Sequence, residues 1–126
     1  MRLLLDTHVV VWAATRPDRL SERARAAIRD VENERLVSAV SIYEIIYKRG
    51  VSQGLGVLPD DVIQLADPLV LSWLAVDEHH ADRAARLPLR HRDPWDRMIV
   101  AQALIDDLTL VTADRALKGY GVPILW

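Results

Sequence analysis

The chain has 126 residues, of which 51% are hydrophobic and 27% are charged, a balance typical of one soluble globular domain and not of a disordered or fibrous chain. Its formal net charge of -2 provides no overall positive field, so a polyanionic ligand would need local basic side chains or bound cations. The sequence has no cysteine, which excludes disulfides, thiolate catalysis and cysteine-based zinc sites and is compatible with a reducing cytosol.

The amino-terminal stretch MRLLLDTHVVVWAATRP resembles a signal peptide only superficially, because Asp6 and His8 interrupt its apolar run. No stretch of the sequence approaches the roughly 18 apolar residues of a membrane span. We therefore expect a cytoplasmic protein that is not bound to a membrane, with one domain over residues 1–126.

The first third of the chain predicts one strand and two helices. Residues 2–5 (RLLL) predict a buried strand that stops at Asp6, and a short helix capped by Thr7 follows. The stretch SERARAAIRDV, at 21–31, predicts a charged and exposed helix that Ser21 caps.

The middle of the chain has one clear strand and one clear helix. The run RLVSAV, at 35–40, predicts the strand, and SIYEIIYKRG, at 41–50, predicts a helix that ends at its glycine. The glycines of 51–57 predict a loop, and 59–70 predicts one or two short helical turns interrupted at Pro68.

The last third alternates again between strands and helices. WLAVD, at 73–77, predicts a strand, EHHADRAARL, at 78–87, a helix, and LTLVTAD, at 108–114, a strand that follows a helix beginning near Pro94. The tail VPILW, at 122–126, offers one more strand. Short apolar strands that alternate with helices predict an α/β fold, with a parallel sheet sandwiched between helices.

In such sheets the ligand crevice lies outside the carboxyl ends of the strands, so the residues that follow strands are the first candidates for chemistry. Asp6 follows LLL and Asp114 follows LVTA, so both are expected at the same edge of the sheet. For either residue alone, a role as a turn or helix-capping residue is the better explanation.

Glu44 lies in the first turn of the helix at 41–50. With Ser41 it forms a capping-box pattern, and Lys48 lies one turn further on, where it can pair with Glu44. The isoleucines of this helix place Glu44 at the boundary of the buried stripe, at the mouth of the helix.

The stretch RDPWDRMIVAQALIDD carries two carboxylates at the start of a nearly all-apolar helix. Asp93 is explained as its N-cap, with Pro94 at the first helical position. Asp96 is then the third helical residue, favoured by the helix dipole, and it borders the core because the helix is apolar on nearly all sides.

The signal lies in the coincidence of four acids that all begin or end elements at one expected edge, namely Asp6, Glu44, Asp96 and Asp114. If they converge to about 5 Å, each ionised pair repels by roughly 3 kcal/mol at an effective dielectric of about 20, so cations or shared protons must neutralise them. Oxygen ligands without cysteine favour Mg²⁺ or Mn²⁺ over Zn²⁺. Such a cluster can promote metal-assisted phosphoryl transfer.

The segments that carry these acids, LLDTHVVVW, SIYEI, HRDPWDRMIVAQA and LVTAD, resemble those of a PIN domain, and the match spans essentially the whole chain. The HRDPWDR form, the DTH motif and the chain length are similar to the VapC-type ribonuclease toxins of bacterial toxin–antitoxin pairs. Trp95 stands where the family often has Phe, and the stretch at 53–72 matches only loosely.

This resemblance implies a Mg²⁺- or Mn²⁺-dependent endoribonuclease that leaves a 5′-phosphate and a 3′-hydroxyl. Asp6, Asp96 and Asp114 would be direct metal ligands, and Glu44 would bind the metal or orient the attacking water. The resemblance also implies a homodimer, silenced by an antitoxin whose carboxyl-terminal segment occupies a groove leading to the site.

The RNA substrate would be held by basic side chains near the acids, since arginine can hold two phosphate oxygens at once. Arg97 is the first candidate and Arg92 the second, whereas Arg83 and Arg86 are equally well explained as a solvated helix surface. Thr112 is a further candidate for substrate contact or for orienting the acids, although strand propensity explains it too.

The histidines and tryptophans are better explained by structure than by chemistry. His8 could carry a proton near the substrate, but a structural role is commoner, and His79, His80 and His91 show no persuasive ligand spacing. The tryptophans are scattered through apolar segments, so a core or interface role is favoured over base stacking for Trp12, Trp73, Trp95 and Trp126.

Two other classes of function stay open. A phosphoacceptor signalling domain has a similar length and an acidic metal pocket, but it needs a lysine after a late strand, and Lys118 follows the helix-like DRAL. A non-catalytic binding subunit would use the acidic pocket only to receive a basic side chain, and the intact set of four acids argues against it.

Overall fold

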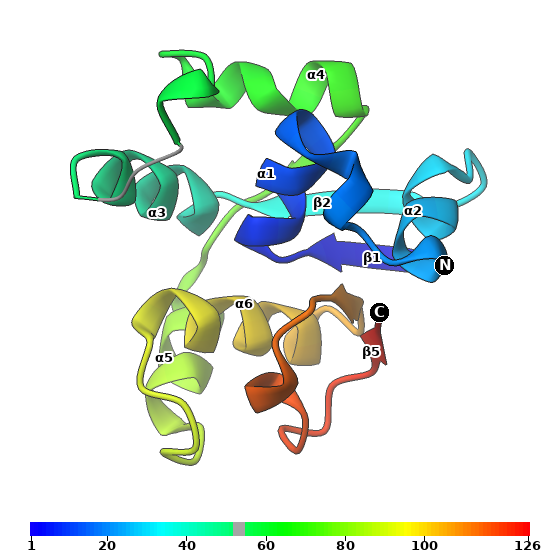
Figure 1. Cartoon of the computed structure of the whole chain (residues 1–126). Helices are drawn as coiled ribbons and strands as arrows, with labels where there is room; N and C mark the ends of the chain where they lie inside the picture. Colours follow the sequence, from blue (N-terminus) through cyan, green and yellow to red (C-terminus); the bar gives the residue numbers. More distant parts are fainter. Residues whose placement is uncertain (52–54) are drawn as a thin grey trace.

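The computed structural model describes residues 1–51 and 55–126, so residues 52–54 of the predicted loop lie outside the described residues. The elements alternate along the chain as the sequence predicts (Figure 1). They are, in order, β1 (Arg2–Leu5), α1 (Thr7–Thr15), η1 (Pro17–Arg19), α2 (Glu22–Arg29), β2 (Glu34–Ser38), α3 (Val40–Arg49), η2 (Leu55–Val57), η3 (Val62–Leu65), α4 (Ala66–Leu69), β3 (Ser72–Leu74), α5 (Glu78–Arg86), α6 (Pro94–Ile105), β4 (Thr109–Val111), η4 (Arg115–Leu117) and β5 (Ile124–Leu125).

The strands of the described residues form one five-stranded parallel sheet in the order β3-β2-β1-β4-β5. β1 lies at the centre, where Leu4 is in register with Leu36 of β2 and with Leu110 of β4. The chain adds β2 and β3 on one side of β1, and it then adds β4 and β5 on the other side. The point of reversal therefore lies between β1 and β4, where open α/β sheets bind their ligands at the carboxyl ends of the strands.

Helices cover both faces of the sheet, which confirms the predicted sandwich (Figure 1). Leu3 and Leu5 of β1 pack with α1 and α2 on one face, whereas Leu4 packs with α5 and α6 on the other. This alternation follows from the two-residue period of a strand, and all three leucines are completely buried. None of the described helices is long and apolar enough to cross a membrane.

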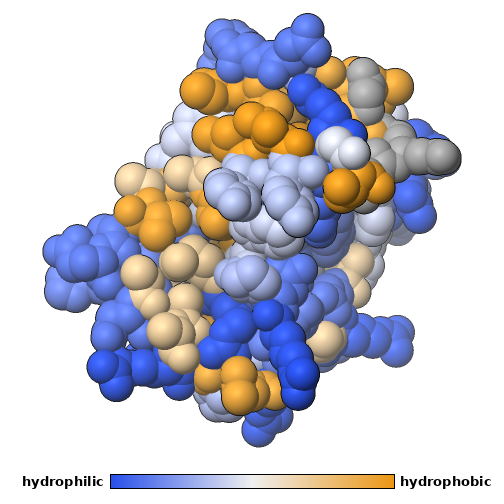
Figure 2. Space-filling model, turned by 90° about the vertical axis from the view of Figure 1, so that its left-hand side faces the viewer, coloured by the Kyte–Doolittle hydropathy of each residue, from blue (hydrophilic) through white to orange (hydrophobic). Residues whose placement is uncertain are grey.

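Helix α3 lies at one side of the sheet and has a small core of its own (Figure 1). Ile45 packs there against Leu58, Val62 and Leu65 of the segment that follows α3. The opposite side of α3 is exposed, including Tyr43, Ile46 and Tyr47 (Figure 2). One face of the helix is therefore fixed by this small core, and the other face stays largely exposed.

Three local predictions are wrong. The cap of α1 is Asp6, whose side chain accepts the Thr7 N–H, and not Thr7 itself. The chain does not break at Pro68, because Pro68 is the third residue of α4, where its missing N–H would have no helical partner. The helix capped by Ser21 is exposed only on its charged face, since Ala24, Ala27 and Ile28 are buried.

Candidate metal centre

Asp6 is a buried carboxylate at the carboxyl end of the central strand. Its own N–H donates to the Val111 carbonyl across the sheet, 3.0 Å away, which fixes its backbone between β1 and β4. Its Oδ1 accepts the Thr7 N–H at 2.7 Å, and its Oδ2 accepts the Thr112 hydroxyl at 2.6 Å. Only 2% of the residue is exposed, so its charge is held in a place that water hardly reaches.

Thr112 connects two of the predicted acids. Its hydroxyl oxygen donates to Asp6 and accepts the backbone N–H of Asp114 at 3.0 Å. Thr112 is 1% exposed, so the prediction that it contacts the substrate is wrong, and its place in the structure is to orient the acids. Asp114 Oδ1 caps η4 through the Ala116 N–H, which leaves its Oδ2 directed elsewhere.

Asp96 enters the site from the first turn of α6. Asp93 is the N-cap, as predicted, and its Oδ1 accepts the N–H groups of Trp95 and Asp96. Pro94 occupies the first helical position, where the absence of an N–H has no cost. The cap leaves the Asp96 carboxylate free to face the ends of β1 and β4.

His91 joins Asp96 to Asp114, although the sequence analysis gave it no site role. Its Nε2 lies 3.1 Å from Asp96 Oδ2 and 3.2 Å from Asp114 Oδ2. Its Nδ1 accepts the backbone N–H of Asp93, which assigns the ring proton of the neutral form to Nε2. Within the described residues, these three side chains offer ligand atoms that all lie within 4.8 Å of one another. The feature of the sequence that could have indicated this role is the position of His91 two residues before the N-cap of α6.

Glu44 reaches the same end of the sheet from α3, and it is 5% exposed. The predicted capping box is wrong, because α3 begins at Val40 with Ala39 as its N-cap, which lacks a capping side chain. The Ser41 hydroxyl instead pairs with the Thr7 hydroxyl at 2.8 Å and so joins α3 to α1. Glu44 Oε2 accepts a hydrogen bond from Lys48, as predicted, and no partner is present in the described residues for its buried Oε1.

The pKa shifts indicate that the four acids interact electrostatically. Burial raises the pKa of Asp96 to about 8, and the charges of Asp6, Asp93, Glu44 and Asp114 add to this shift. Burial also raises the pKa of Asp6, although His8 and the hydrogen bonds from Thr112 and Thr7 oppose the shift and Glu44 adds to it. The structure therefore brings the predicted acids together in a place where their combined ionisation is unfavourable.

This arrangement fits a bound cation. Three observations support the fit: carboxylates from four separate elements, a raised pKa at Asp96, and a buried carboxylate oxygen of Glu44 that lacks a partner. A divalent ion would satisfy the free oxygen and favour the ionised form of Asp96. The Nε2 of His91 adds one nitrogen to a ligand set that is otherwise oxygen.

Arg97 is not available to a substrate, and the prediction that it binds RNA is wrong. The residue is 9% exposed, and among the described residues its guanidinium donates to backbone carbonyls. Nη2 donates to the carbonyls of Ala84, Ala85 and Leu87 at the end of α5, and Nη1 to those of Pro88 and His91. Arg97 therefore ties the end of α5 and the loop that carries His91 to α6. Arg92, in contrast, is exposed beside the site.

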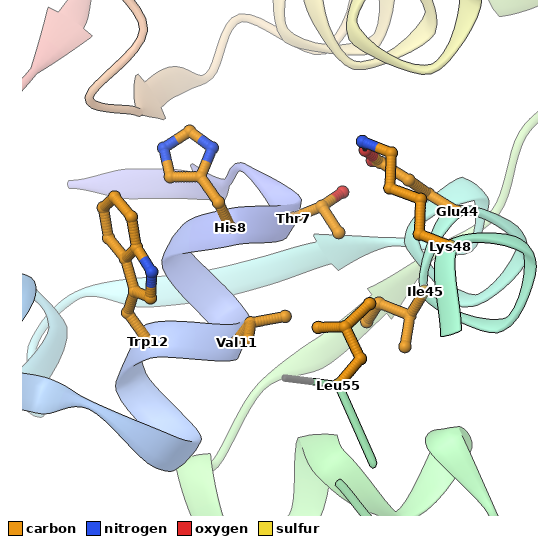
Figure 3. A pocket seen from close by; sticks show the side chains of 8 residues that line it. All are labelled: Thr7, His8, Val11, Trp12, Glu44, Ile45, Lys48 and Leu55. Atoms are coloured by element: carbon orange, nitrogen blue, oxygen red, sulfur yellow. Dashed lines mark hydrogen bonds and ion pairs between the residues drawn. The ribbon is translucent and has the colours of Figure 1, made fainter. Parts of the chain in front are cut away.

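A largely apolar pocket of about 170 Å³ opens beside the acids (Figure 3). Trp12 and Val11 of α1 line one side, and Ile45 of α3 and Leu55 line the other. The His8 ring packs against Trp12 with their centroids 4.8 Å apart. Its Nε2 accepts the Ala113 N–H and its Nδ1 faces Asp6, so His8 holds the amino-terminal end of α1 to the segment after β4.

The tryptophans occupy structural positions. Trp12, Trp73 and Trp126 are partly buried against the core on the α1 face of the sheet, which confirms the core role predicted for them. Trp95 packs instead against the exposed Tyr43 and Tyr47 of α3, with ring centroids 5.9 and 5.4 Å away. An aromatic surface therefore joins α3 to the start of α6.

Comparison with known proteins agrees with this geometry. Ribonuclease VapC22 of Mycobacterium tuberculosis is 36% identical to this chain, over 96% of the chain and 93% of the relative. The fold resembles that in the DNA-bound VapBC structure from Salmonella typhimurium, with a TM-score of 0.72 and 19% identity over 99% of this chain and 97% of that chain. It also resembles that in VapBC2 of Rickettsia felis bound to a promoter DNA fragment, with a TM-score of 0.67 and 16% identity over 99% and 98% of the two chains.

The model of the PIN domain family matches residues 3–122, which include all four of the predicted acids. The matched residues include strands β2 to β4, helices α1 to α6 and the four acids. The chain belongs to the PIN domain family.

Proposed function

We propose that the protein is a metal-dependent endoribonuclease that acts as the toxin of a toxin–antitoxin pair, with the whole chain, residues 1–126, as its PIN domain. The observation that carries the proposal is the convergence of Asp6, Glu44, Asp96 and Asp114 at the point where the order of the strands reverses. The similarity to Ribonuclease VapC22 supports RNA as the substrate.

The proposed centre holds Mg²⁺ or Mn²⁺ through Asp6, Asp96 and Asp114, with Glu44 as a further ligand or as the group that orients water. The ion would supply an activated water and would stabilise the leaving oxygen of a phosphodiester. Hydrolysis in this way leaves a 5′-phosphate and a 3′-hydroxyl.

The remaining residues prepare this site. Thr112 and the Thr7 N–H fix the two oxygens of Asp6, so that they need little rearrangement when an ion binds. His91 holds Asp96 and Asp114 near each other. The carboxyl of Asp96 retains a proton near neutral pH in the metal-free chain, and a bound ion would favour its ionised form. Exposed Arg92 is placed to hold an RNA phosphate.

The proposed partners follow from the relatives. VapBC complexes are among the structural neighbours, which supports a cognate antitoxin for this chain. We place a second copy of the chain against the exposed face of α3, where Tyr43, Ile46 and Tyr47 provide an apolar surface (Figure 2).

The test is cleavage of cellular RNA by the purified protein with Mg²⁺, with Mn²⁺ and with EDTA. We expect cleavage only with metal, and a loss of at least about 100-fold in each of Asp6→Asn, Asp96→Asn and Asp114→Asn. Sequencing of the RNA ends checks for the 5′-phosphate. Equal residual activity in the wild type and all three variants would rule out the assignment.

The phosphoacceptor alternative is disfavoured by two features. Lys118 is exposed and follows η4, so it does not reach the site from the end of a strand. Both oxygens of Asp6 already accept hydrogen bonds from the protein. Uptake of phosphate from acetyl phosphate without RNA cleavage would support this alternative instead.

A further inference from the structure

Lys48 is a positive charge placed inside the acidic site by the same helix that supplies Glu44. It lies one helical turn after Glu44 and donates to Glu44 Oε2, and Figure 3 shows the two charged ends together. Its ammonium also lies 5.5 Å from the centre of the Trp95 ring, over the face of the indole. The side chain is 39% exposed, so its position is held by these contacts and not by burial alone.

The surroundings of Lys48 keep it charged. An ordinary lysine side chain is already charged at neutral pH, and the Glu44 carboxylate within hydrogen-bonding distance favours that charged form. Because it lies over the ring of Trp95, the ammonium acts on the first turn of α6 as well as on its own helix. It is a permanent cation among the acids that would bind metal.

The charge of the cluster limits how many ions it can hold. Asp6, Glu44, Asp96 and Asp114 carry four negative charges when all are ionised, and Lys48 cancels one of them. One divalent ion then leaves the cluster with a single negative charge, which suits a site that must still accept an anionic phosphodiester. A second divalent ion would make the cluster positive and would be repelled by the ammonium.

Glu44 shows where the ammonium acts. One of its oxygens is occupied by Lys48, and the other is buried without a partner in the described part of the chain. A carboxylate that bridged two ions with one ion on each oxygen would need both oxygens free. We infer that Lys48 takes the place of a second divalent ion, so that the centre holds one ion per chain through Glu44 Oε1 and the aspartates. This inference rests on the proposed function.

The experiment is a titration of the full-length, metal-free protein with Mn²⁺, followed by the electron paramagnetic resonance of the free ion and by calorimetry. We expect about one Mn²⁺ per chain in the wild type and about two in Lys48→Met. The first ion should bind at least about tenfold more tightly to Lys48→Met, because a like charge has been removed. Methionine keeps an unbranched side chain of similar length without the charge, and Lys48→Gln is a second neutral variant.

Three further variants locate the effect. Lys48→Met combined with Glu44→Gln should return to about one ion, since no uncompensated carboxylate is left for the second. Lys48→Arg should keep about one ion, because the charge is kept. Arg49→Met is the matched control: it removes a positive charge one residue away, where the guanidinium donates to the Pro59 carbonyl, and it should bind Mn²⁺ like the wild type.

Two ions in the wild type, or a Lys48→Met variant with unchanged stoichiometry and affinity, would overturn the inference and leave the nuclease proposal intact if RNA is still cleaved. Binding of no Mn²⁺ by either protein would overturn both.

Discussion

At each end of helix α6 lies a histidine that contacts two aspartates. Asp96 lies in its first turn beside His91 and Asp114, and Asp106 caps its last turn beside His80 and Asp77. About 15 Å of helix separates Asp96 from Asp106, at the usual rise per residue. The two groups contain the same residue types, yet only one of them has the features of a metal centre.

At the carboxyl-terminal end of α6, every polar group of the histidine has one partner. His80 Nδ1 accepts the Asp77 N–H, and Asp77 in turn accepts the His80 N–H, which together form a capping box for α5. His80 Nε2 lies 2.7 Å from Asp106 Oδ2. The exposed Asp77 has a lowered pKa, chiefly because it accepts the His80 N–H. The group is balanced without any added ion.

At the amino-terminal end of α6, only the Nδ1 of His91 is bonded in the same way as in His80. Its Nδ1 accepts a backbone N–H, but its Nε2 faces two carboxylates at similar distances and has one proton to offer. Asp6 and Glu44 add more negative charge nearby. The difference shows that the number of carboxylates per donor, and not the presence of histidine and aspartate, distinguishes a candidate metal site from a structural cap.

The largest expected effect comes from the same substitution at the two ends of α6. Asp96→Asn should lower metal-dependent RNA cleavage by at least about 100-fold, because an amide supplies no charge to the ion. Asp106→Asn should leave cleavage within about twofold and lower stability by about 1 kcal/mol. Rates on a fluorogenic RNA measure both effects. Equal losses in the two variants would remove the distinction between the two groups.

The second prediction concerns the support beneath His91. Arg97→Ala should lower the free energy of unfolding by about 2 kcal/mol or more, because it leaves several buried carbonyls without their donor. Urea denaturation measures this loss, with the exposed Arg83→Ala on the same face of the fold as a control that should stay within about 0.5 kcal/mol. A neutral Arg97→Ala would contradict the structural role assigned to the guanidinium.

The third prediction compares the two histidines directly. His91→Gln should weaken Mn²⁺ binding by about tenfold or more, since Asp96 and Asp114 lose the group that holds them together. His80→Gln should leave Mn²⁺ binding unchanged and lower thermal stability instead. Calorimetric titration and thermal unfolding of both variants check the pair, and the reverse pattern would exchange their roles.

The last prediction concerns the dependence of stability on pH in metal-free protein. The pKa of Asp96 is about 8 in the folded chain, against 3.8 for an ordinary aspartate. Between these values the folded state binds the additional proton, so stability is greatest below about pH 4 and falls as pH rises towards about 8, by up to about 1 kcal/mol per pH unit. Urea denaturation in EDTA at several pH values measures the slope.

Asp96→Asn should reduce this slope to the part that comes from the raised pKa of Asp6, and Asp106→Asn should leave it unchanged. Saturating Mn²⁺ should also reduce it in the wild type, because the ion favours the ionised carboxylate. A slope that is unchanged in Asp96→Asn would assign the titration to another group.

The sequence predicts well the strands and helices that carry the site, because local patterns of residues determine these elements. The apolar run at 2–5 and the Asp93-Pro94 start of α6 determine their elements through patterning and capping, and parallel pairing then brings Asp6 and Asp114 to one edge. Each of these steps depends on a few neighbouring residues.

The wrong predictions at the site concern contacts between segments that are distant in the sequence. Arg97 lies next to Asp96 in the sequence, but its guanidinium turns to carbonyls at the end of α5, which no local pattern reveals. Ser41 and Glu44 have the spacing of a capping box, yet α3 starts earlier and Ser41 pairs with Thr7 on another helix. His91 was missed because a loop brings it to the acids.

The order of the strands also has a consequence for biosynthesis. β1 is made first but takes β4 as one of its neighbours, and Asp6 is fixed by Thr112. During translation Asp6 leaves the ribosome long before Thr112 and Asp114 have been added, so a nascent chain carries no complete centre. A chain with this order of strands completes its candidate centre only after the segment that carries Thr112 and Asp114 has been made.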